Sequence, residues 1–256
     1  MKISIITVCY NAEKFIENCI NSVLSQTYKN IEFILIDGAS RDNTLSIIKK
    51  YNKYITKLIS EPDAGIYDAM NKGIQISTGE IIGFLNSDDF YSNNEVLLKV
   101  ALEFKKNEKL KACYADLVYV KQKKEEQVIR FWKSGNFHYG SFSNGWSPPH
   151  PTFFVHRSVY EKYGNFDLNY RISSDVELMM RFLDVNKINV KYIPEIWVKM
   201  RMGGLSNNKF KNIFKQNFEV LTALRRHGLK SNLVVFFYKK FLSRFKQFIF
   251  KSKNYL

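Results

Sequence analysis

Strand-like and helix-like segments alternate from Lys2 to Leu85, and this alternation is what most restricts the fold of the chain. The strand-like segments are short, apolar and rich in β-branched residues, while the helix-like segments repeat their apolar residues at helical spacing. Strands that alternate with helices predict a parallel sheet built from right-handed crossovers, which is an α/β fold. The predicted strands are Lys2–Val8, Ile31–Ile36, Thr56–Ile59 and Glu80–Leu85, and the predicted helices are Glu13–Ser25, Asn43–Tyr51 and Tyr67–Ile76.

The second half of the chain has a different pattern. Cys113–Val120 and Gln127–Trp132 predict a hairpin around a charged loop. The Gly-, Ser- and Asn-rich stretch Ser134–Ser147 predicts a long irregular segment, and such segments are usually functional or mobile. The remaining predicted strands are Thr152–His156, Val190–Ile193 and Ile196–Met200, and the remaining predicted helices are Ser158–Tyr163, Asp175–Leu183, Phe210–Arg226 and Leu233–Phe250.

Two adjacent acids follow the fourth predicted strand, in the tetrapeptide Asn86–Asp89. Neighbouring carboxylates repel each other, and a divalent cation with hard oxygen ligands relieves that repulsion. The end of a strand also fixes where side chains point, and open α/β sheets bind ligands at the carboxyl ends of their strands. The tetrapeptide therefore predicts a metal site at Asp88 and Asp89. The alternative is a turn that caps a helix, because Asn, Ser and Asp favour turns and caps alike.

The first two predicted strands end in residues that suit a nucleoside. Thr7–Asn11 supplies a backbone edge and the ring of Tyr10, and Asp37–Ser40 supplies an acid. Neighbouring strand ends form a crevice in an open sheet, where a base can stack and sugar hydroxyls can bond to a carboxylate. The sequence has no P-loop and no GxGxxG motif to cradle phosphates. A cation held by Asp88 and Asp89 is the natural substitute for neutralising a diphosphate.

Five motifs in order resemble the family 2 glycosyltransferases, which have the GT-A fold. They are Ser4–Asn11, Ser22–Tyr28, Phe33–Ser40, Glu61–Gly73 and Gly79–Asp89. The resemblance extends from about Lys2 to Leu205 and is strongest to bacterial enzymes that build cell-surface polysaccharides. It implies a mixed, mainly parallel sheet flanked by helices in a domain over residues 1–205. The nucleotide-sugar half would span about 1–110 and the acceptor half about 111–205, followed by a basic helical extension over 206–256.

The resemblance also implies roles for particular residues. The positions that match its nucleotide-sugar site are Thr7, Tyr10, Asn11, Asp37, Asp68, Lys72, Asn86 and Asp88. Asp88 matches the metal-binding acid of the family's DxD motif, and the implied cofactor is Mn²⁺ or Mg²⁺. Asn86 replaces the first acid of that motif, and Asp89 is a possible compensation. We therefore expect weaker or more Mn²⁺-selective metal dependence, with the site retained.

The resemblance places the catalytic base at Asp175, at the start of a predicted helix, with Glu177 as the second candidate. Leu178, Met179 and Phe182 follow at helical spacing, which puts Asp175 at the exposed end of a buried stripe. The alternative is that Asp175 only caps the helix. A base on one side of the sugar and a cation on the leaving diphosphate predict a single displacement that inverts the anomeric carbon.

Other positions resemble the acceptor or diphosphate side of the family's site: His150, and the late loop that carries Arg201 and Ser206. A structural histidine and a simple turn after a strand are the alternatives. The donor that the resemblance implies is a nucleotide sugar, specifically a UDP-sugar. The implied acceptor is a glycan on a polyprenyl diphosphate. A non-catalytic module that binds nucleotide or glycan is the competing reading, and the presence of Asp88, Asp89 and Asp175 weighs against it.

The formal net charge of +15 is concentrated in the tail. From Asn208 to Leu256 nine Lys and three Arg face the single acid Glu219, a local charge of +11. The predicted helix Leu233–Phe250 carries an apolar stripe and a basic polar face, which predicts an interfacial anchor on an anionic membrane. The alternative is a helix packed on the body with a solvated basic face. Nucleic acid is not an expected partner, because the sequence has no nucleic-acid-binding motif.

The composition predicts a cytoplasmic protein, and the resemblance together with the basic tail implies peripheral association with the inner face of the cell membrane. Three cysteines without CxxC spacing favour a reducing compartment. The N-terminus has a strand pattern that is too short for a signal-peptide core. No apolar run approaches the roughly 20 residues that span a bilayer. The sequence leaves the donor sugar, the linkage and the oligomeric state open.

Overall fold

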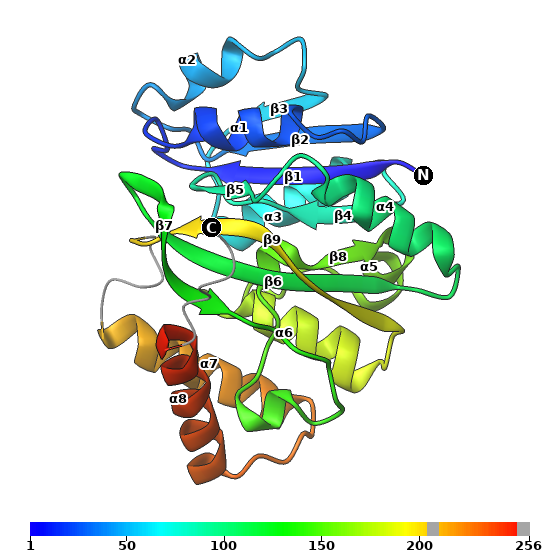
Figure 1. Ribbon diagram of the computed structural model, residues 1–256, viewed down its shortest axis with the longest axis vertical. Helices are drawn as coiled ribbons and strands as arrows, with labels where there is room; N and C mark the ends of the chain where they lie inside the picture. Colours follow the sequence, from blue (N-terminus) through cyan, green and yellow to red (C-terminus); the bar gives the residue numbers. More distant parts are fainter. Residues whose placement is uncertain (204–209, 250–256) are drawn as a thin grey trace.

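The computed structural model describes residues 1–203 and 210–249. Within them a nine-stranded sheet has the strand order β3-β2-β1-β4-β8-β6-β9-β5, with β7 paired to β6 (Figure 1). The strands are β1 Ile3–Cys9, β2 Ile31–Asp37, β3 Lys57–Ser60, β4 Ile81–Phe84, β5 Asp89–Tyr91, β6 Ala112–Lys121, β7 Lys124–Trp132, β8 Phe154–His156 and β9 Val190–Arg201. The helices are α1 Ile16–Leu24, α2 Thr44–Lys49, α3 Ile66–Ile76, α4 Val96–Lys106, α5 Arg157–Tyr163, α6 Ser174–Met180, α7 Phe210–Arg226 and α8 Leu233–Ile249. Three short helical turns are η1 Phe142–Asn144, η2 His150–Thr152 and η3 Arg181–Val185.

The predicted parallel half of the sheet is confirmed. β1 lies between β2 and β4 and is parallel to both, and β3 is parallel to β2. Every residue of β1 is buried, as expected for a central parallel strand that is covered on both faces. The carboxyl ends of β1, β2 and β4 therefore meet at one edge of the sheet, where the predicted site residues follow.

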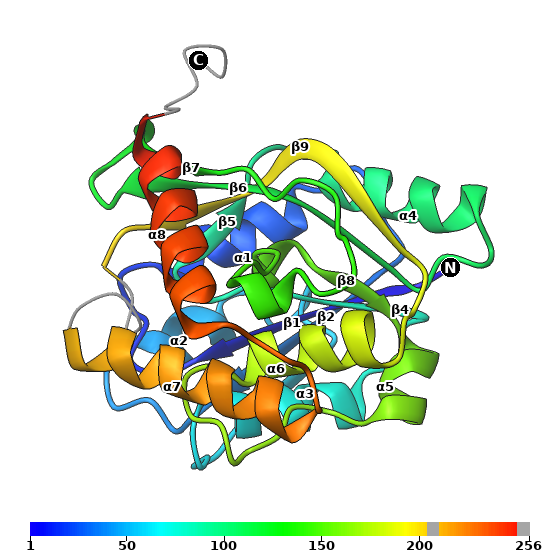
Figure 2. The same ribbon diagram turned by 90° about the horizontal axis from the view of Figure 1, so that it is seen from below.

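Helices cover both faces of the sheet (Figure 2). On one face α1, α2 and α4 pack on Ile3, Ile5 and Leu35, and on the other face α3, α5, α6 and α7 enclose a core that includes Ile6 and Ile34. Alternate residues of β1 and β2 thus belong to opposite cores, which follows from the two-residue period of a strand. In this arrangement the apolar stripes of the helices and the apolar runs of the strands are buried against each other.

The second half of the sheet is mixed, and several of its predicted bounds are wrong. The hairpin is confirmed as β6 and β7, but its turn is shorter than the predicted loop. The two strands predicted at Val190–Ile193 and Ile196–Met200 are one strand, β9, which runs parallel to β6 with an irregular register near Asp116. Pro194 lies at this irregularity, where a residue without an N–H is tolerated. Helix α4 and the short strand β5 were not predicted.

Helix α7 is built into the body of the protein. Val220, Ala223 and Leu224 are buried in the core beneath α6. Glu219 accepts hydrogen bonds from the backbone N–H groups of Ile172 and Ser173, each at 2.9 Å. The first part of the predicted extension therefore fixes the chain segment that leads into α6.

Helix α8 packs on the body through a mixed polar and apolar side. Phe236 is fully buried, Gln247 is buried and hydrogen-bonded to Arg130, and the helix rests against β7 and η1. The predicted apolar stripe faces outward: Val234 is 78% exposed and Phe241 is 67% exposed. Among the described residues no helix is long and apolar enough to cross a bilayer.

Glu32 on β2 illustrates how a buried charge is held in this sheet, and it gives a testable prediction. Its carboxylate accepts hydrogen bonds from the Ser4 hydroxyl and from the N–H and hydroxyl of Thr78, and it pairs with Lys57 at 3.4 Å. Burial raises its pKa, but the hydrogen bonds from Ser4 and Thr78 outweigh burial and lower the pKa from 4.5 to about 2. The ionised carboxylate therefore stabilises the fold above pH 4.5, and this contribution is lost as the pH falls toward 2.

We expect Glu32→Gln to lower the free energy of unfolding at neutral pH by about 2 kcal/mol, because buried donors lose a charged acceptor. The difference between the variant and the unmodified protein should shrink as the pH falls through the window from 4.5 to about 2. Urea unfolding at neutral pH and inside that window measures both values. A difference that is equal at both pH values would contradict the role given to the ionised carboxylate.

Candidate active site

The ends of β1 and β2 form a rigid polar edge. Asp37 is fully buried and its carboxylate accepts hydrogen bonds from the Ser60 hydroxyl at 2.7 Å and from the Ser40 N–H at 3.1 Å. Asn11 has a φ of 50°, and its side-chain Oδ1 accepts a bond from the N–H of Arg41 at 2.9 Å. Asn and Asp are the side chains that tolerate this left-handed conformation best after glycine. The loops after both strands are thus locked to each other.

The side chains of Thr7 and Tyr10 differ in exposure. The Thr7 side chain is fully buried, and its hydroxyl lies 3.8 Å from the Cys19 sulfur on α1. Only the backbone of Thr7 is therefore placed to meet a base at the strand edge. Tyr10 is 57% exposed directly after β1, so its ring is free to stack on a base.

The loop between β3 and α3 lies against the end of β2. A Cβ added to Gly38 would come within 2.5 Å of the Asp63 carboxylate, so the Asp63 side chain would have to move to accommodate a larger residue at this position. Lys72 pairs with Glu61 at 2.8 Å and with Asp68 at 3.7 Å. Asp68 and Lys72, two predicted donor-site residues, are therefore near each other, and both help to hold this loop in place.

The predicted metal acids lie in a tight turn between β4 and β5. Asn86 Nδ2 donates to Asp89 Oδ2 at 2.8 Å, and the Asp89 N–H donates to the Asn86 carbonyl at 3.0 Å. Asp89 is fully buried, and its Oδ1 has no hydrogen-bond partner within residues 1–203 and 210–249. Burial, with the neighbouring Asp88 adding to it, raises the pKa of Asp89 well above its ordinary value, and burial also raises the pKa of Asp88.

This turn has the features of a cation site. Two neighbouring carboxylates offer hard oxygen atoms, one of them an orphaned buried oxygen, and a nearby positive charge would favour their ionised forms. No group of three His, Cys, Asp or Glu side chains that could hold a metal ion occurs in the described part of the chain. A cation here would thus take its other ligands from a bound diphosphate or from water. The residues present fit a divalent cation whose remaining ligands come from a diphosphate or from water.

Arg201 joins this turn from the end of β9. Its guanidinium is 2% exposed, donates to the Asp88 carbonyl and forms an ion pair with Glu125. It also lies over the ring of Phe90 at 4.6 Å. The structure therefore brings Arg201, predicted for the diphosphate side, next to Asp88. Ser206, predicted for the same loop, lies outside the described residues.

Asp175 lies in the first turn of α6 and is bonded to a residue of α3. The Tyr67 hydroxyl lies 2.9 Å from Asp175 Oδ1 and 2.8 Å from the Ile172 carbonyl. Tyr67 is on α3, the helix that also carries Asp68 and Lys72. The predicted buried stripe below Asp175 is confirmed, since Leu178, Met179 and Phe182 are all buried. The contact with Tyr67 fixes Asp175 of α6 against α3.

His150 lies on η2 between these two groups of acids. Its ring packs on Phe84, the last residue of β4, with centroids 5.2 Å apart, and on Phe166 at 5.5 Å. Its Nε2 is buried and has no hydrogen-bond partner among the residues that the structure describes. Burial lowers the pKa of His150 and the charge of Asp175 opposes this shift, so the imidazole is neutral and within electrostatic range of Asp175.

Glu177 has a different environment from Asp175. It is 3% exposed, accepts a bond from Arg181 Nε at 3.0 Å and lies 2.7 Å from His227 Nε2. Burial raises its pKa, but the bonds from His227 and Arg181 outweigh burial and lower it. Its carboxylate holds α6 to α7, which leaves Asp175 as the acid available to a substrate.

One contact at the site was not predicted from the sequence. Tyr67 is the partner of Asp175, although the two residues are 108 positions apart. The only sequence signal was that Tyr67 lies within the motif Glu61–Gly73, and the resemblance implied no role for Tyr67. A contact over such a distance depends on how the two halves pack.

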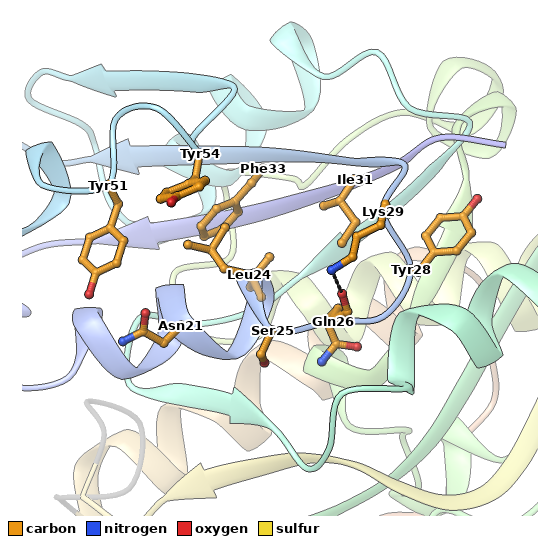
Figure 3. A pocket seen from close by; sticks show the side chains of 11 residues that line it. Asn21, Leu24, Ser25, Gln26, Tyr28, Lys29, Ile31, Phe33, Tyr51 and Tyr54 are labelled. Atoms are coloured by element: carbon orange, nitrogen blue, oxygen red, sulfur yellow. Dashed lines mark hydrogen bonds between the residues drawn. The ribbon is translucent and has the colours of Figure 1, made fainter.

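A separate hollow of about 800 Å³ lies between the end of α1 and the edge of β2, away from these acids (Figure 3). Its lining includes Lys29, whose ammonium donates to the Gln26 carbonyl at 2.8 Å, and the rings of Tyr51 and Tyr54. None of the predicted site residues lines it. The hollow is therefore separate from the candidate active site.

Comparisons with known proteins agree with this geometry. The model of the family described as "Glycosyl transferase family 2" matches residues 4–164. A PGL/p-HBAD biosynthesis glycosyltransferase of Mycobacterium bovis (strain BCG / Pasteur 1173P2) is 26% identical over 225 residues, which are 86% of this chain and 85% of the relative. An uncharacterized glycosyltransferase of Mycobacterium tuberculosis (strain H37Rv) is 30% identical over 181 residues, 70% of this chain and 68% of the relative.

Solved structures share the fold at low sequence identity. S. aureus TarS 1–349 in complex with UDP-GlcNAc matches with a TM-score of 0.71 and 19% identity, over 99% of this chain and 77% of that one. The mannosyltransferase PcManGT from Pyrobaculum calidifontis, in complex with GDP-Man and Mn²⁺, matches with a TM-score of 0.66 and 16% identity, over 94% and 69% of the two chains. The chain therefore belongs to glycosyl transferase family 2, has the GT-A fold and is a glycosyltransferase.

Proposed function

We propose that the protein is an inverting, metal-dependent glycosyltransferase that moves a sugar from a UDP-sugar to a saccharide acceptor on a lipid diphosphate. The observation that carries this proposal is the hydrogen bond between Tyr67 and Asp175, which ties an acid of the acceptor half to the helix of the donor half. Nucleotide-sugar donors are favoured because TarS and PcManGT were solved with UDP-GlcNAc and GDP-Man. The residues proposed for the donor are Thr7, Tyr10, Asn11, Asp37, Asp68, Lys72, Asn86 and Asp88.

In the proposed reaction Asp175 accepts the proton of the acceptor hydroxyl. The hydroxyl oxygen forms a bond to the anomeric carbon as the bond from that carbon to the diphosphate breaks. The nucleoside diphosphate leaves with the electron pair on the side opposite to attack, so the configuration inverts. Asp88, with Asp89 beside it, would hold a divalent cation that acts as a Lewis acid toward the leaving group. Arg201 adds a fixed positive charge next to Asp88.

His150 and Glu177 are given supporting roles. His150 is proposed to bond a hydroxyl of the bound sugar through Nε2, a buried atom without a hydrogen-bond partner among the described residues. Glu177 holds α6 in place through Arg181 and His227. A non-catalytic binding module is disfavoured, because Asp88 and Asp175 are both retained and Asp175 is bonded to Tyr67 of α3, a helix of the proposed donor half.

The direct test is a panel of nucleotide sugars supplied with Mn²⁺, scored by the release of free nucleotide with and without a lipid-linked saccharide. We expect one UDP-sugar to release UDP faster when the acceptor is present. No release from any nucleotide sugar, with a protein that binds UDP, would instead support the non-catalytic module.

We further propose that the enzyme works at the inner face of the cell membrane in polysaccharide biosynthesis, held there by α8. The outward stripe of this helix consists of large apolar side chains that are 45–78% exposed. Its members are Val234, Phe237, Tyr238, Phe241, Phe245, Phe248 and Ile249. A contiguous apolar surface of this kind marks an interaction site, and the surrounding basic residues suit an anionic bilayer.

This placement predicts the effect of replacing two stacked rings of the stripe. Phe241 and Phe245 lie with ring centroids 6.3 Å apart and are both more than half exposed. We expect the double variant Phe241→Ser, Phe245→Ser to bind phosphatidylglycerol vesicles at least about tenfold more weakly, because two apolar side chains no longer leave water. Flotation with such vesicles measures the change, and Leu102→Ser on α4 is a matched control.

The thermal stability of the double variant should be unchanged, since neither ring packs in the core. Vesicle binding that equals that of the unmodified protein would remove α8 as the anchor.

A further inference from the structure

The side of α8 that faces the body carries an unusual group of positive charges. Lys240 and Arg244 are one helical turn apart, and Arg130 of β7 donates to Gln247 of the same helix at 2.6 Å. Lys240, Arg244 and Gln247 follow one another at helical spacing on one face of α8, so the bond from Arg130 to Gln247 brings the three cationic side chains to that face. We call it the α8 cation cluster.

No carboxylate neutralises the cluster within residues 1–203 and 210–249. Lys240 Nζ donates to the side-chain oxygen of Asn217 at 2.7 Å and lies over the ring of Phe236. Arg130 lies over the ring of Tyr119 at 4.6 Å. Amide oxygens and aromatic rings are weak partners compared with a carboxylate. Positive charges gathered in this way repel one another unless an anion binds between them.

Burial, and after it the charge of Arg244, lower the pKa of Lys240 to about 8. A bound phosphate would reverse this shift, because an opposite charge favours the protonated ammonium. The cluster therefore has the electrostatics of an anion site and gains stability when an anion is present.

The cluster lies between the membrane-facing stripe and the proposed base. Asn217, the partner of Lys240, is next to Gln216, whose carbonyl accepts a bond from the Ser173 hydroxyl at 3.2 Å, two residues before Asp175. The charge of Asp175 also acts directly on Lys240. The apolar stripe occupies the outer side of the same helix. A molecule with a lipid tail, a phosphate group and a sugar would meet the apolar stripe, the α8 cation cluster and Asp175 in that order.

We propose that Arg130, Lys240 and Arg244 bind the phosphate groups of the lipid-linked acceptor and so place its sugar hydroxyl at Asp175. This proposal rests on the proposed glycosyl transfer and adds the site that recognises the acceptor. Guanidinium groups suit it, since they bind phosphate oxygens in pairs. The proposed function gives the donor's diphosphate to Asp88, so the α8 cation cluster is left for the acceptor.

The test uses the full chain and vesicles of phosphatidylcholine that contain either a polyprenyl diphosphate or phosphatidylglycerol at equal surface charge. We expect the unmodified protein to bind the polyprenyl diphosphate vesicles more tightly. Lys240→Gln and Arg244→Gln should each weaken that binding by about tenfold, about 1.4 kcal/mol, and abolish the preference. Lys239→Gln is the matched control: it removes the same charge from the same helix, at an exposed residue that contacts Asn144 at 3.1 Å.

Four outcomes would overturn the proposal. One is equal binding to the two anionic vesicles, and another is an equal loss in the Lys239 and Lys240 variants, which would indicate general membrane attraction. The third is a rise in the donor's KM in Lys240→Gln, which would assign the cluster to the nucleotide. Competition by inorganic pyrophosphate with no preference for the lipid form would likewise reduce the site to one for free phosphate.

Failure of this proposal is distinguishable from failure of the proposed function. Release of UDP from a UDP-sugar in the absence of acceptor reports the donor site, and it should be the same in the unmodified protein and in the control variant Lys239→Gln. If the protein releases UDP but shows no vesicle preference, only the proposed acceptor site is contradicted. A protein that shows the vesicle preference but never releases nucleotide loses the transferase mechanism.

Discussion

An Asp175→Asn variant is expected to lose transfer activity by about 10²- to 10⁴-fold in kcat, the usual contribution of a positioned general base. The amide cannot accept the proton of the acceptor hydroxyl, yet it keeps the size of the carboxylate and can still bond to the Tyr67 hydroxyl. The donor should therefore bind as before, with an unchanged KM. Steady-state rates of UDP release with saturating acceptor measure the effect.

Two controls separate catalysis from folding in this experiment. The melting temperature of Asp175→Asn should match that of the unmodified protein. Glu177→Gln should instead lower the melting temperature, since Glu177 holds Arg181 and His227. Unchanged transfer by Asp175→Asn would remove Asp175 as the base.

Removal of divalent metal is expected to abolish transfer, and Asp88→Asn should lower kcat/KM by about thousandfold, since a Lewis acid contributes several kcal/mol to the transition state. Activity in EDTA should return with Mn²⁺, and the variant should need more Mn²⁺ than the unmodified protein. The physical reason is that the buried turn offers two carboxylates, one of which has an orphaned oxygen. Titration of the rate with Mn²⁺ measures both effects.

An exposed acid outside the turn provides the control for Asp88→Asn. Glu108→Gln changes the formal charge by the same amount and should leave the Mn²⁺ titration unchanged. Full activity in EDTA, or a normal titration in Asp88→Asn, would contradict the metal site.

The fold of the first half could be predicted because its strands and helices are bounded by clear changes of period. β1 and β2 are buried on both faces, so they read as continuous apolar runs. Helix α4 was missed although Val96, Val100 and Phe104 have helical spacing and are buried. β9 was split into two strands because Pro194 interrupts its pattern, while the ladder with β6 continues across a register shift.

The candidate site was predictable where its residues follow strand ends. Asp37 and Asp88 were found because parallel strands deliver their last residues to one edge. The contacts within the site join segments that are far apart in the sequence, such as Tyr67 with Asp175 and Arg201 with Asp88. The pattern of residues within one segment does not predict such contacts. Thr7 shows the same limit, because only the structure tells which face of β1 its side chain takes.

Helix α8 shows how far amphipathic pattern can be interpreted. The pattern correctly separated an apolar stripe from a polar face, but either side could have packed on the body. The structure places a mixed side inward, which carries Phe236, Lys240 and Gln247, and leaves the apolar stripe outside. Specific partners on α7 and β7 decide this, and the sequence of α8 alone does not contain them.

The measurement that bears most directly on the proposed transfer is a crystal structure of the chain with Mn²⁺ and UDP. We expect uracil beside Tyr10 and Asp37, the ion on Asp88 and the diphosphate, and the Asp175 carboxylate facing that diphosphate across the space for a sugar. A nucleotide bound elsewhere, or an Asp175 carboxylate on a different surface from the ion, would contradict glycosyl transfer at this site.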